Sequence, residues 1–380
     1  MIHRMRPESF GGIVGLTDPP ALVFVDQDYM RTLGLPDSPL WHRTSTHLSA
    51  PTEVHFNLTR RCQLACRHCT SNSSNLNNSE LSTLEVRDAI DTLAKMGVFH
   101  IAFGGGELFL RSDAIELAQY ARTRNIIPNA TTNGYAITPQ LARECVVFGQ
   151  VNVSLDALGP KAGLVRGNSD FARIDQALKA LVAAGVSTGI NCVVTRANFE
   201  FMDDIARYAE DIGLKEVLFL RLKPSGRAKE IYHQFSLLPE QARALYPKLA
   251  HISELAKITI QTDCSFVPHL CAHNPSIEAM KMLGVEGCGG GDMLLGINAE
   301  GAVNACSHHS EEVSHVRHLD RLWNEHSHFH KFRSRRVTTP RCLACSYVEL
   351  CKGGCPLFSE FILGDFDAAD PECPLLCGEG

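Results

Sequence analysis

Short β-branched runs alternate with stretches of helical periodicity between residues 52 and 264, and this alternation constrains the fold more than any other feature. The runs that predict strands are Val54–Leu58, His100–Phe103, Ile127–Thr131, Val151–Leu155, Gly189–Val194 and Val217–Leu220. The stretches that predict helices are Glu80–Met96, Asp113–Arg124, Thr138–Cys145, Phe171–Ala184 and Phe199–Ile212. This spacing is typical of a parallel sheet built from βα units. We therefore predict an α/β fold with a partial (β/α)6 barrel, short of the eight units of a closed barrel.

The segments on either side of this region have a different character. The 380-residue chain exceeds one average domain, and we predict three parts, residues 1–51, 52–264 and 265–380. Near the N-terminus, FGGIV and ALVFVD predict a short hairpin. After residue 265, Gly, Cys and His replace the regular hydrophobic pattern. A loop-rich segment of this kind needs a further source of stability, such as bound metal clusters.

Composition excludes several classes of protein. Lys plus Arg number 36 and Asp plus Glu number 42, giving a formal net charge of −6, which is not the pattern of a general nucleic-acid binder. No apolar run approaches the roughly 20 residues of a membrane span. The opening residues MIHRMRPESFGG lack the apolar core of a signal peptide. We therefore expect a cytoplasmic protein without nucleic-acid or membrane partners.

The fifteen cysteines are unevenly distributed. Three lie within eight residues, Cys62, Cys66 and Cys69, and six lie between Cys342 and Cys377. Reducing cytosol argues against a disulfide framework, so this clustering indicates metal ligation.

The first cysteine set, Cys62-x3-Cys66-x2-Cys69, follows the first predicted strand. Three thiolates from one loop can hold three corners of a 4Fe–4S cluster and leave the fourth iron open, as catalysis requires. The alternative is a zinc site completed by His68 or His55.

This cysteine set resembles that of the radical S-adenosylmethionine (SAM) superfamily, and four further segments extend the resemblance. They are Gly104–Glu107 (GGGE), Thr131–Gly134 (TTNG), Ser154–Asp156 (SLD) and Val165–Gly167 (VRG), the first three at the ends of predicted strands. The resemblance implies that SAM is bound by Gly105, Gly106, Glu107, Thr131, Ser154 and Arg166, with Glu107 near its amino group and Arg166 near its carboxylate. The chain departs from the family at Leu108, where proline is usual after GGE.

The C-terminal cysteines resemble the seven-cysteine SPASM extension of certain radical SAM enzymes, which holds two auxiliary 4Fe–4S clusters. The resemblance assigns Cys288, Cys306 and Cys355 to the first auxiliary cluster, and Cys342, Cys345, Cys351 and Cys373 to the second. With the first set, this implies three 4Fe–4S clusters. A zinc ribbon on the CxxC pair is the alternative. The fourth iron of the first auxiliary cluster is either open or bound by one of five residues: Asp292, His308, Cys264, Cys271 or Cys377.

Residues 52–377 most resemble peptide maturases of the mycofactocin maturase type, in stretches such as MGVFHIAFGGGE and RLKPSGRA. The resemblance implies a 5′-deoxyadenosyl radical that abstracts hydrogen from a ribosomally made precursor peptide. Auxiliary clusters would accept the electron, giving a crosslink or an oxidative decarboxylation. Expected partners are the peptide, with or without a separate recognition protein, and an electron donor such as flavodoxin or ferredoxin. The alternatives are haem or porphyrin side-chain modification, oxidation of a sulfatase Cys or Ser, and a non-enzymatic electron carrier. No general acid or base stands out.

Overall fold

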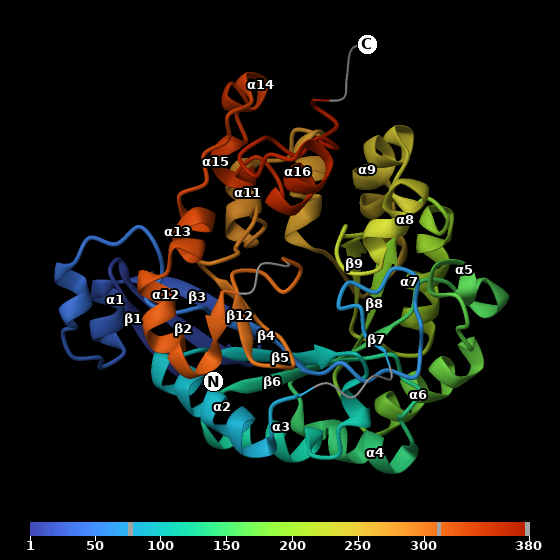
Figure 1. The fold of residues 1–380 in the computed structure, drawn as a ribbon, viewed down its shortest axis with the longest axis horizontal. Coiled ribbons are helices and arrows are strands. Elements are labelled where there is room, and N and C mark those ends of the chain that lie inside the picture. The colour runs from blue at the N-terminus through green and yellow to red at the C-terminus, as the bar shows by residue number, and fades with distance from the viewer. Residues whose placement is uncertain (75–78, 310–312, 377–380) are drawn as a thin grey trace.

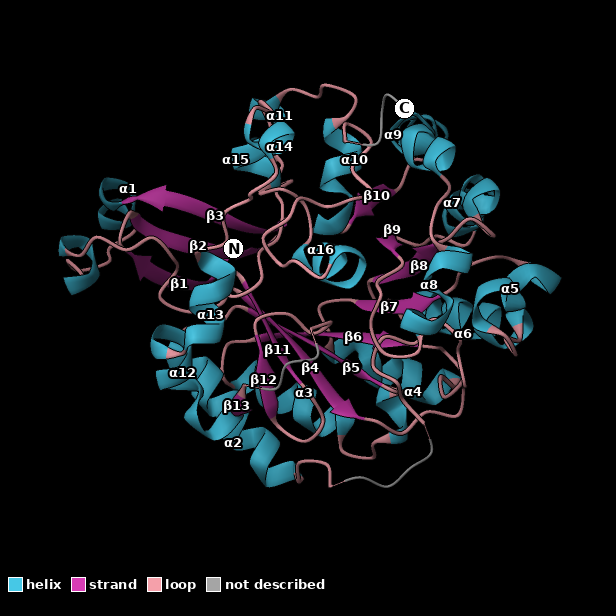
Figure 2. Ribbon diagram, turned by 45° about the horizontal axis from the view of Figure 1, so that its top comes forward, coloured by secondary structure: helices cyan, strands magenta, loops and turns pink. Residues whose placement is uncertain are grey.

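The computed structural model describes residues 1–74, 79–309 and 313–376, and within these ranges its main element is a ten-stranded sheet (Figures 1 and 2). The strand order is β10-β9-β8-β7-β6-β5-β4-β11-β12-β13. Strands β4 to β10 pair in parallel. The bounds are β4 Glu53–Thr59, β5 His100–Gly105, β6 Ile127–Thr132, β7 Val151–Ser154, β8 Thr188–Val194, β9 Glu216–Arg221 and β10 Thr259–Thr262. The predicted α/β class and the six predicted strands are confirmed, while β10 was not predicted.

Helices cover the outer face of this curved sheet (Figure 1). On that side lie α2 Thr83–Met96, α3 Ala114–Thr123, α4 Pro139–Glu144, α6 Phe171–Ala183, α7 Met202–Asp211 and α9 Pro239–Leu255. Two shorter helices, α5 Gly163–Arg166 and α8 Ala228–Phe235, come after the carboxyl ends of β7 and β9.

Helix α2 illustrates how the sequence sets these boundaries. Ser82 caps its N-terminus in a reciprocal box with Glu85, and Gly97 ends it in the left-handed region. Its buried side chains recur with helical spacing, at Val86, Ala89, Ile90 and Leu93. The helix therefore begins three residues later than the predicted Glu80, at the first residue after its cap.

The C-terminal segment is more regular than the sequence predicts. Strand β11 (Leu294–Ile297) pairs in parallel with β4, and β12 (Ala302–Asn304) and β13 (Ser314–His315) continue the sheet antiparallel. Short helices carry the rest of the segment: α10 Val267–Cys271, α11 Ile277–Met282, α12 Leu319–Glu325, α13 Ser327–Arg333, α14 Pro340–Leu343, α15 Val348–Cys351 and α16 Pro356–Leu363. Each is too short to show the helical periodicity from which sequence predictions are made.

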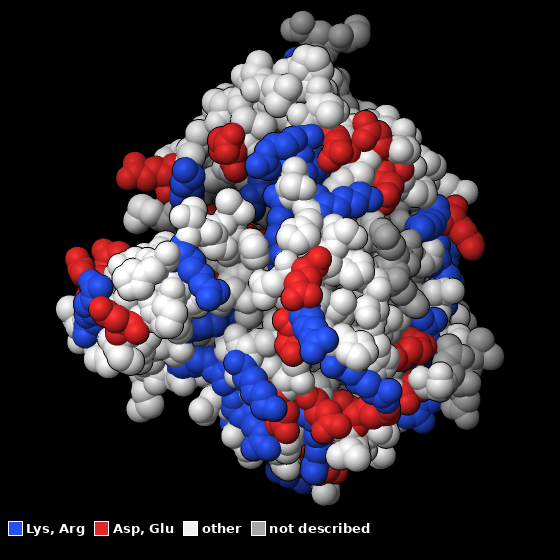
Figure 3. Space-filling view, turned by 60° about the vertical axis from the view of Figure 1, so that its left-hand side comes forward, with Lys and Arg blue, Asp and Glu red and all other residues white. Residues whose placement is uncertain are grey.

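The N-terminal residues form a separate antiparallel sheet of β1 (Ile2–Glu8), β2 (Gly11–Thr17) and β3 (Pro20–Asp26), followed by α1 (Gln27–Thr32). The hairpin predicted from FGGIV and ALVFVD is confirmed as β2 and β3, while β1 was not predicted. Figure 3, which brings this side of the molecule forward, shows acidic and basic side chains interspersed. Among the described residues, no helix is both long enough and apolar enough to cross a membrane.

A buried arginine fastens the N-terminal sheet to the barrel. Arg6 donates to the Glu8 carboxylate at 2.8 Å, and to the carbonyls of Ala50 and Pro51 at 2.8 Å each, just before β4 begins. The Glu8 carboxylate also accepts from the Ser49 amide at 2.8 Å. Arg6 and Glu8 are both buried, so neither charge has water as an alternative partner.

We predict that Arg6→Ala weakens the docking of the N-terminal sheet by about 3–5 kcal/mol, because the Glu8 carboxylate is left buried without its cation. Hydrogen exchange of the β1 and β2 amides measures this loss. Arg31→Ala is the matched control, since the ion pairs of Arg31 with Asp28 and Asp37 are exposed to solvent. Equal exchange in the two variants would contradict the assigned role of Arg6.

Candidate active site and cysteine clusters

A cleft with an empty volume of about 920 Å³ opens at the carboxyl ends of the parallel strands. The chain places nearly all of its sequence-predicted SAM residues and the first cysteine set around this one space. The lining includes Cys62, Cys66, Cys69, Gly105, Gly106, Thr131, Ser154 and Arg166. Ligands of parallel α/β folds bind at this edge of the sheet.

The first cysteine loop begins three residues after β4 ends. The Leu64 amide donates to the Cys62 sulfur at 3.5 Å, and the Ser73 amide donates to the Cys69 sulfur at 3.4 Å. Burial raises the pKa of the Cys62 and Cys66 thiols. Among the described residues, no group of three or more His, Cys, Asp or Glu side chains is close enough together to hold a single metal ion. The three sulfur atoms instead face a hollow, and the inward-directed amides suit a thiolate-held cluster.

The histidines of the alternative zinc site are engaged elsewhere. The His55 ring contacts the Ser307 hydroxyl at 3.0 Å. The His68 ring lies 3.4 Å from the Asp156 carboxylate and 3.3 Å from the Val165 carbonyl. Burial lowers the pKa of His68 to about 4, against the opposing effect of Asp156, so this imidazole is neutral at pH 7.

The GGGE segment begins at the end of β5 and lies directly against the end of β4. The Gly106 amide donates to the Thr59 carbonyl at 2.7 Å, and the Glu107 amide donates to the Arg61 carbonyl at 2.8 Å. A Cβ atom at Gly105 would lie 2.2 Å from the Thr59 oxygen, and one at Gly106 would lie 2.2 Å from the Arg61 oxygen. Only glycine permits this approach, which joins the GGGE segment to the cysteine loop.

Glu107 lies behind the cleft wall and is fully buried. Its carboxylate accepts from the Thr132 hydroxyl and the Asn133 amide at 2.7 Å each, and from the Phe109 amide at 3.2 Å. Burial raises the pKa of Glu107, and these hydrogen bonds oppose the rise. The carboxylate thus holds the TTNG turn, whose Asn133 side chain donates to the Cys62 sulfur at 3.8 Å.

Arg166 faces the cleft with a carboxylate partner of its own. Its Nε lies 2.7 Å from Asp156, which is fully buried at the end of the SLD segment. Cys66 is among the groups whose charge acts on Arg166. The guanidinium therefore sits beside the first cysteine set, held in place by Asp156.

Sequence reasoning missed three cations of the cleft wall, Arg221, Lys223 and Arg227. The RLKPSGRA stretch, which directly follows the sixth predicted strand, was the available signal. Arg227 donates to the carbonyls of Cys66 at 2.9 Å and Ser73 at 2.7 Å, so it braces the first cysteine loop. Gly226 approaches the same loop so closely that a Cβ atom would lie 2.5 Å from the Cys69 oxygen.

A second cavity, of about 710 Å³, lies within the C-terminal segment. Its lining includes Cys342, Cys345, Cys351 and Cys373, the four cysteines expected at the second auxiliary cluster. Cys271 lines the same cavity, and its hydrogen bond with Cys351 is the main cause of a raised Cys351 pKa.

The three cysteines expected at the first auxiliary cluster, Cys288, Cys306 and Cys355, form a separate group. Burial raises the pKa of Cys288 and Cys306 to about 12, and the neighbouring Cys355 thiol adds to the rise at both. The Gly290 amide donates to the Cys288 sulfur at 3.4 Å. Each C-terminal group thus includes a buried cysteine, Cys351 in one and Cys355 in the other.

Comparison with known proteins identifies the family. Residues 56–212 match the family model "Radical SAM superfamily". The chain is 33% identical to the mycofactocin maturase MftC of Mycobacterium ulcerans over 341 residues, covering 86% of this chain and 88% of that protein. The chain belongs to the radical SAM superfamily.

A more distant relative and a solved structure extend the comparison. The AdoMet-dependent heme synthase of Nitratidesulfovibrio vulgaris is 28% identical over 342 residues, or 84% of this chain and 91% of that protein. The fold matches SuiB of Streptococcus suis bound to SAM, with a TM-score of 0.78 and 16% identity over 98% of each chain. SuiB bound to its precursor peptide SuiA gives a TM-score of 0.76 with 16% identity, over 97% of this chain and 98% of SuiB.

As a radical SAM protein, the chain is an enzyme that uses a 4Fe–4S cluster and SAM. The family predicted from the sequence is confirmed. The open cleft and its donor set of three thiols, glycine backbone and hydroxyls fit these two groups.

We predict that Gly226→Ala selectively weakens the first cysteine loop, because the added methyl group would strike the carbonyls of Cys69 and Thr70. The reconstituted variant should lose most of the SAM-dependent change in its iron–sulfur absorption spectrum. Gly284→Ala is the control, since Gly284 has a similar positive φ of +66° but open space where a Cβ atom would lie. Loss in both variants would assign the effect to backbone strain and contradict the close-approach argument.

A second prediction concerns pH. The raised pKa of about 12 at Cys288 and Cys306, against an ordinary value near 9, means that the folded, cluster-free chain retains protons that the unfolded chain loses. Its stability is therefore lost as pH rises through this window. Between about pH 8 and pH 10 its Tm should fall more steeply than that of the iron-loaded chain, whose ligands are already thiolates. Replacing both cysteines with alanine should flatten the cluster-free slope, and an unchanged slope would refute the assignment.

Proposed function

We propose that this chain is a radical SAM peptide maturase that carries three 4Fe–4S clusters and modifies a ribosomally made precursor peptide. The observation that carries the proposal is the shared cleft: the first cysteine set, Gly105, Gly106, Thr131, Ser154 and Arg166 all line one hollow. An electron carrier has no need for this arrangement around a cysteine set with one iron left open.

Each residue of the cleft has a role in the proposal. Cys62, Cys66 and Cys69 would hold the first cluster, which together with SAM supplies the 5′-deoxyadenosyl radical that abstracts a hydrogen atom. The backbone of Gly105 and Gly106 would orient the SAM amino group. Glu107 would fix that wall through the TTNG turn, since its carboxylate is already bound there.

The remaining contacts complete the SAM site. Thr131 and Ser154 offer hydroxyl groups from the ends of β6 and β7. Arg166 would compensate the SAM carboxylate while Asp156 keeps the guanidinium in position. Burial of these groups at the strand ends would limit the access of water to the reacting atoms.

The two C-terminal cysteine groups support the proposed auxiliary clusters. Cys342, Cys345, Cys351 and Cys373 surround a cavity of about 710 Å³, and Cys288, Cys306 and Cys355 form the second group. In the proposal these cysteines would hold two auxiliary clusters, which when bound would supply the acceptor for the electron lost as the peptide closes a crosslink or loses carbon dioxide.

The relatives support a peptide as the substrate. Mycofactocin maturase is the relative with 33% identity, and SuiB has been solved with a precursor peptide. We further propose that the enzyme works in the cytoplasm with flavodoxin or ferredoxin as electron donor, and that a separate recognition protein or residues 1–51 bind the peptide leader. The relationship to a heme synthase keeps porphyrin modification as the second candidate.

The test is an anaerobic incubation of the reconstituted enzyme with SAM, a reductant and a short peptide encoded beside its gene, followed by intact-mass measurement. We predict loss of two hydrogens, or of carbon dioxide plus two hydrogens, together with formation of 5′-deoxyadenosine. A variant with Cys62, Cys66 and Cys69 replaced by alanine should form neither product. An unchanged peptide with continuing 5′-deoxyadenosine formation would exclude that peptide and favour a porphyrin, while absence of 5′-deoxyadenosine would contradict the proposed chemistry.

A further inference from the structure

The three cysteines Cys288, Cys306 and Cys355 leave one position of the first auxiliary cluster without a ligand. The sequence offers five residues for it, and the structure places four of them. Cys377 lies outside the described residues. The position matters because an open iron can bind substrate directly. A cluster whose four irons each have a protein ligand serves only to pass electrons.

Three of the four described candidates face other parts of the molecule. The Asp292 carboxylate accepts from the Leu48 amide at 2.9 Å, at the junction with the N-terminal segment. His308 lines the SAM cleft. Cys271 lines the cavity of the second auxiliary set and is hydrogen-bonded to Cys351.

Cys264 is the candidate that lies with the group. It follows β10 in a short 3₁₀ turn, Cys264–Phe266, that Asp263 caps. Cys355 belongs to the same buried cluster as Leu222, and a Cβ atom at Gly354 would lie 3.0 Å from the side chain of Pro268, four residues after Cys264. In agreement with this packing, Cys264 interacts electrostatically with Cys288, Cys306 and Cys355. Four thiols from four separate chain segments are therefore gathered in one place.

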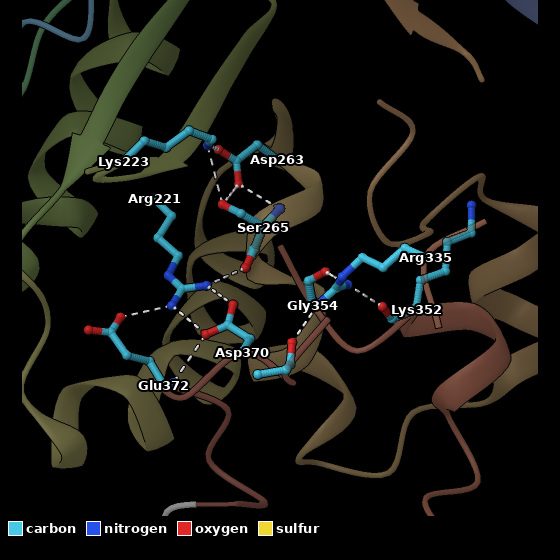
Figure 4. A network of polar contacts seen from close by, with 10 residues as sticks. Arg221, Lys223, Asp263, Ser265, Arg335, Lys352, Gly354, Asp370 and Glu372 are labelled. Atoms are coloured by element: carbon cyan, nitrogen blue, oxygen red, sulfur yellow. Dashed lines mark hydrogen bonds and ion pairs between the residues drawn. The ribbon is translucent and has the colours of Figure 1, made fainter. Parts of the chain in front are cut away.

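A network of buried polar contacts fixes the Cys264 turn against the barrel (Figure 4). The Lys223 ammonium, on the loop after β9, pairs with Asp263 and donates to the Ser265 hydroxyl at 3.2 Å. It therefore binds the residues on both sides of Cys264. Arg221 donates to the Ser265 carbonyl at 2.9 Å.

The same network positions the segment that carries Cys355. Arg335 donates to the carbonyls of Lys352 at 2.7 Å and Gly354 at 3.0 Å (Figure 4). Lys223 and Arg335 also supply positive charge. Lys223 interacts with Cys264 and Cys355, and Arg335 interacts with Cys288. A cluster held by four thiolates is an anion, and these cations suit its charge.

We propose that Cys264 is the fourth protein ligand of the first auxiliary cluster, which is then held by Cys264, Cys288, Cys306 and Cys355 with no iron open to substrate. The inference rests on the proposed function, since it requires that the auxiliary cluster exists. The substrate radical would pass its electron to this cluster without coordinating to it, and Lys223, which faces both the SAM cleft and these thiols, lies between the two.

The experiment uses full-length chain in which Cys62, Cys66 and Cys69 are alanine, so that spectra report only the auxiliary clusters. This parent is compared with added Cys264→Ala, Cys264→Ser and Cys145→Ala, after anaerobic reconstitution. Cys145 is the matched control, because its thiol is buried in the barrel core apart from both groups. Iron content and the EPR spectrum of the reduced protein are measured with and without cyanide, which binds an open iron.

The parent should hold about eight irons per chain, as two four-iron clusters require, and its spectrum should not respond to cyanide. Cys264→Ala should either lose about half of this iron or keep it with a cyanide-sensitive spectrum, and Cys264→Ser should keep it with shifted g values. Cys145→Ala should match the parent. A parent that already responds to cyanide, or a Cys264→Ala variant identical to the parent, overturns the inference while leaving the auxiliary clusters in place. A parent without iron overturns the proposed clusters themselves.

Alkylation of the unmutated chain gives a second measurement that does not depend on the folding of a variant. Cys264 should be protected from iodoacetamide in the iron-loaded enzyme and should react after the iron is removed, in parallel with Cys288. Equal labelling of Cys264 in both forms would overturn the inference.

Discussion

The carboxyl ends of neighbouring parallel strands meet at one edge of the sheet, and the site depends on this constraint. The first cysteine loop follows β4, the GGGE segment begins at the end of β5, and Thr131 and Ser154 lie at the ends of β6 and β7. Residues separated by about a hundred positions in the chain therefore line one cleft. The glycines of GGGE then bring two of these strand ends into backbone contact.

A second set of contacts joins the barrel to the cysteine-rich C-terminal segment. Arg221, at the end of β9, pairs with Asp370 at 2.6 Å and with Glu372 at 2.8 Å. Its guanidinium also lies 3.6 Å from the centre of the Phe358 ring. Arg221 and Asp370 are almost fully buried, so each charge depends on the other. This pairing holds the segment that bears Cys373 against the strand whose following loop braces the first cysteine set.

Much of this arrangement could be predicted from the sequence, for identifiable physical reasons. The six strands β4 to β9 are β-branched runs with helices between them, and local pattern is enough to find them. Strand β1 lacks such a run, and β10 has four residues, with the sequence TIQT. Gly105, Thr131 and Ser154 lie at the carboxyl ends of parallel strands, so their meeting at the cleft follows from topology.

What the sequence could not supply were contacts between segments distant in the chain. Cys264 and Cys271 lie seven residues apart and look equivalent as candidate ligands, yet they face different groups of thiols. Similarly, nothing in the spacing of RLKPSGRA indicates that Arg227 donates hydrogen bonds to the first cysteine loop or that Lys223 donates one to the Cys264 turn. These roles depend on how the loop after β9 packs, which periodicity and spacing do not describe.

The central claim is that the cysteines of this chain hold three separate four-iron clusters. Iron and sulfide analysis with Mössbauer spectroscopy of the anaerobically reconstituted, unmutated enzyme tests it most directly. The account predicts about twelve irons per chain, all with the parameters of 4Fe–4S clusters. A value near four irons, with the C-terminal cysteines free or bound to zinc, would contradict it.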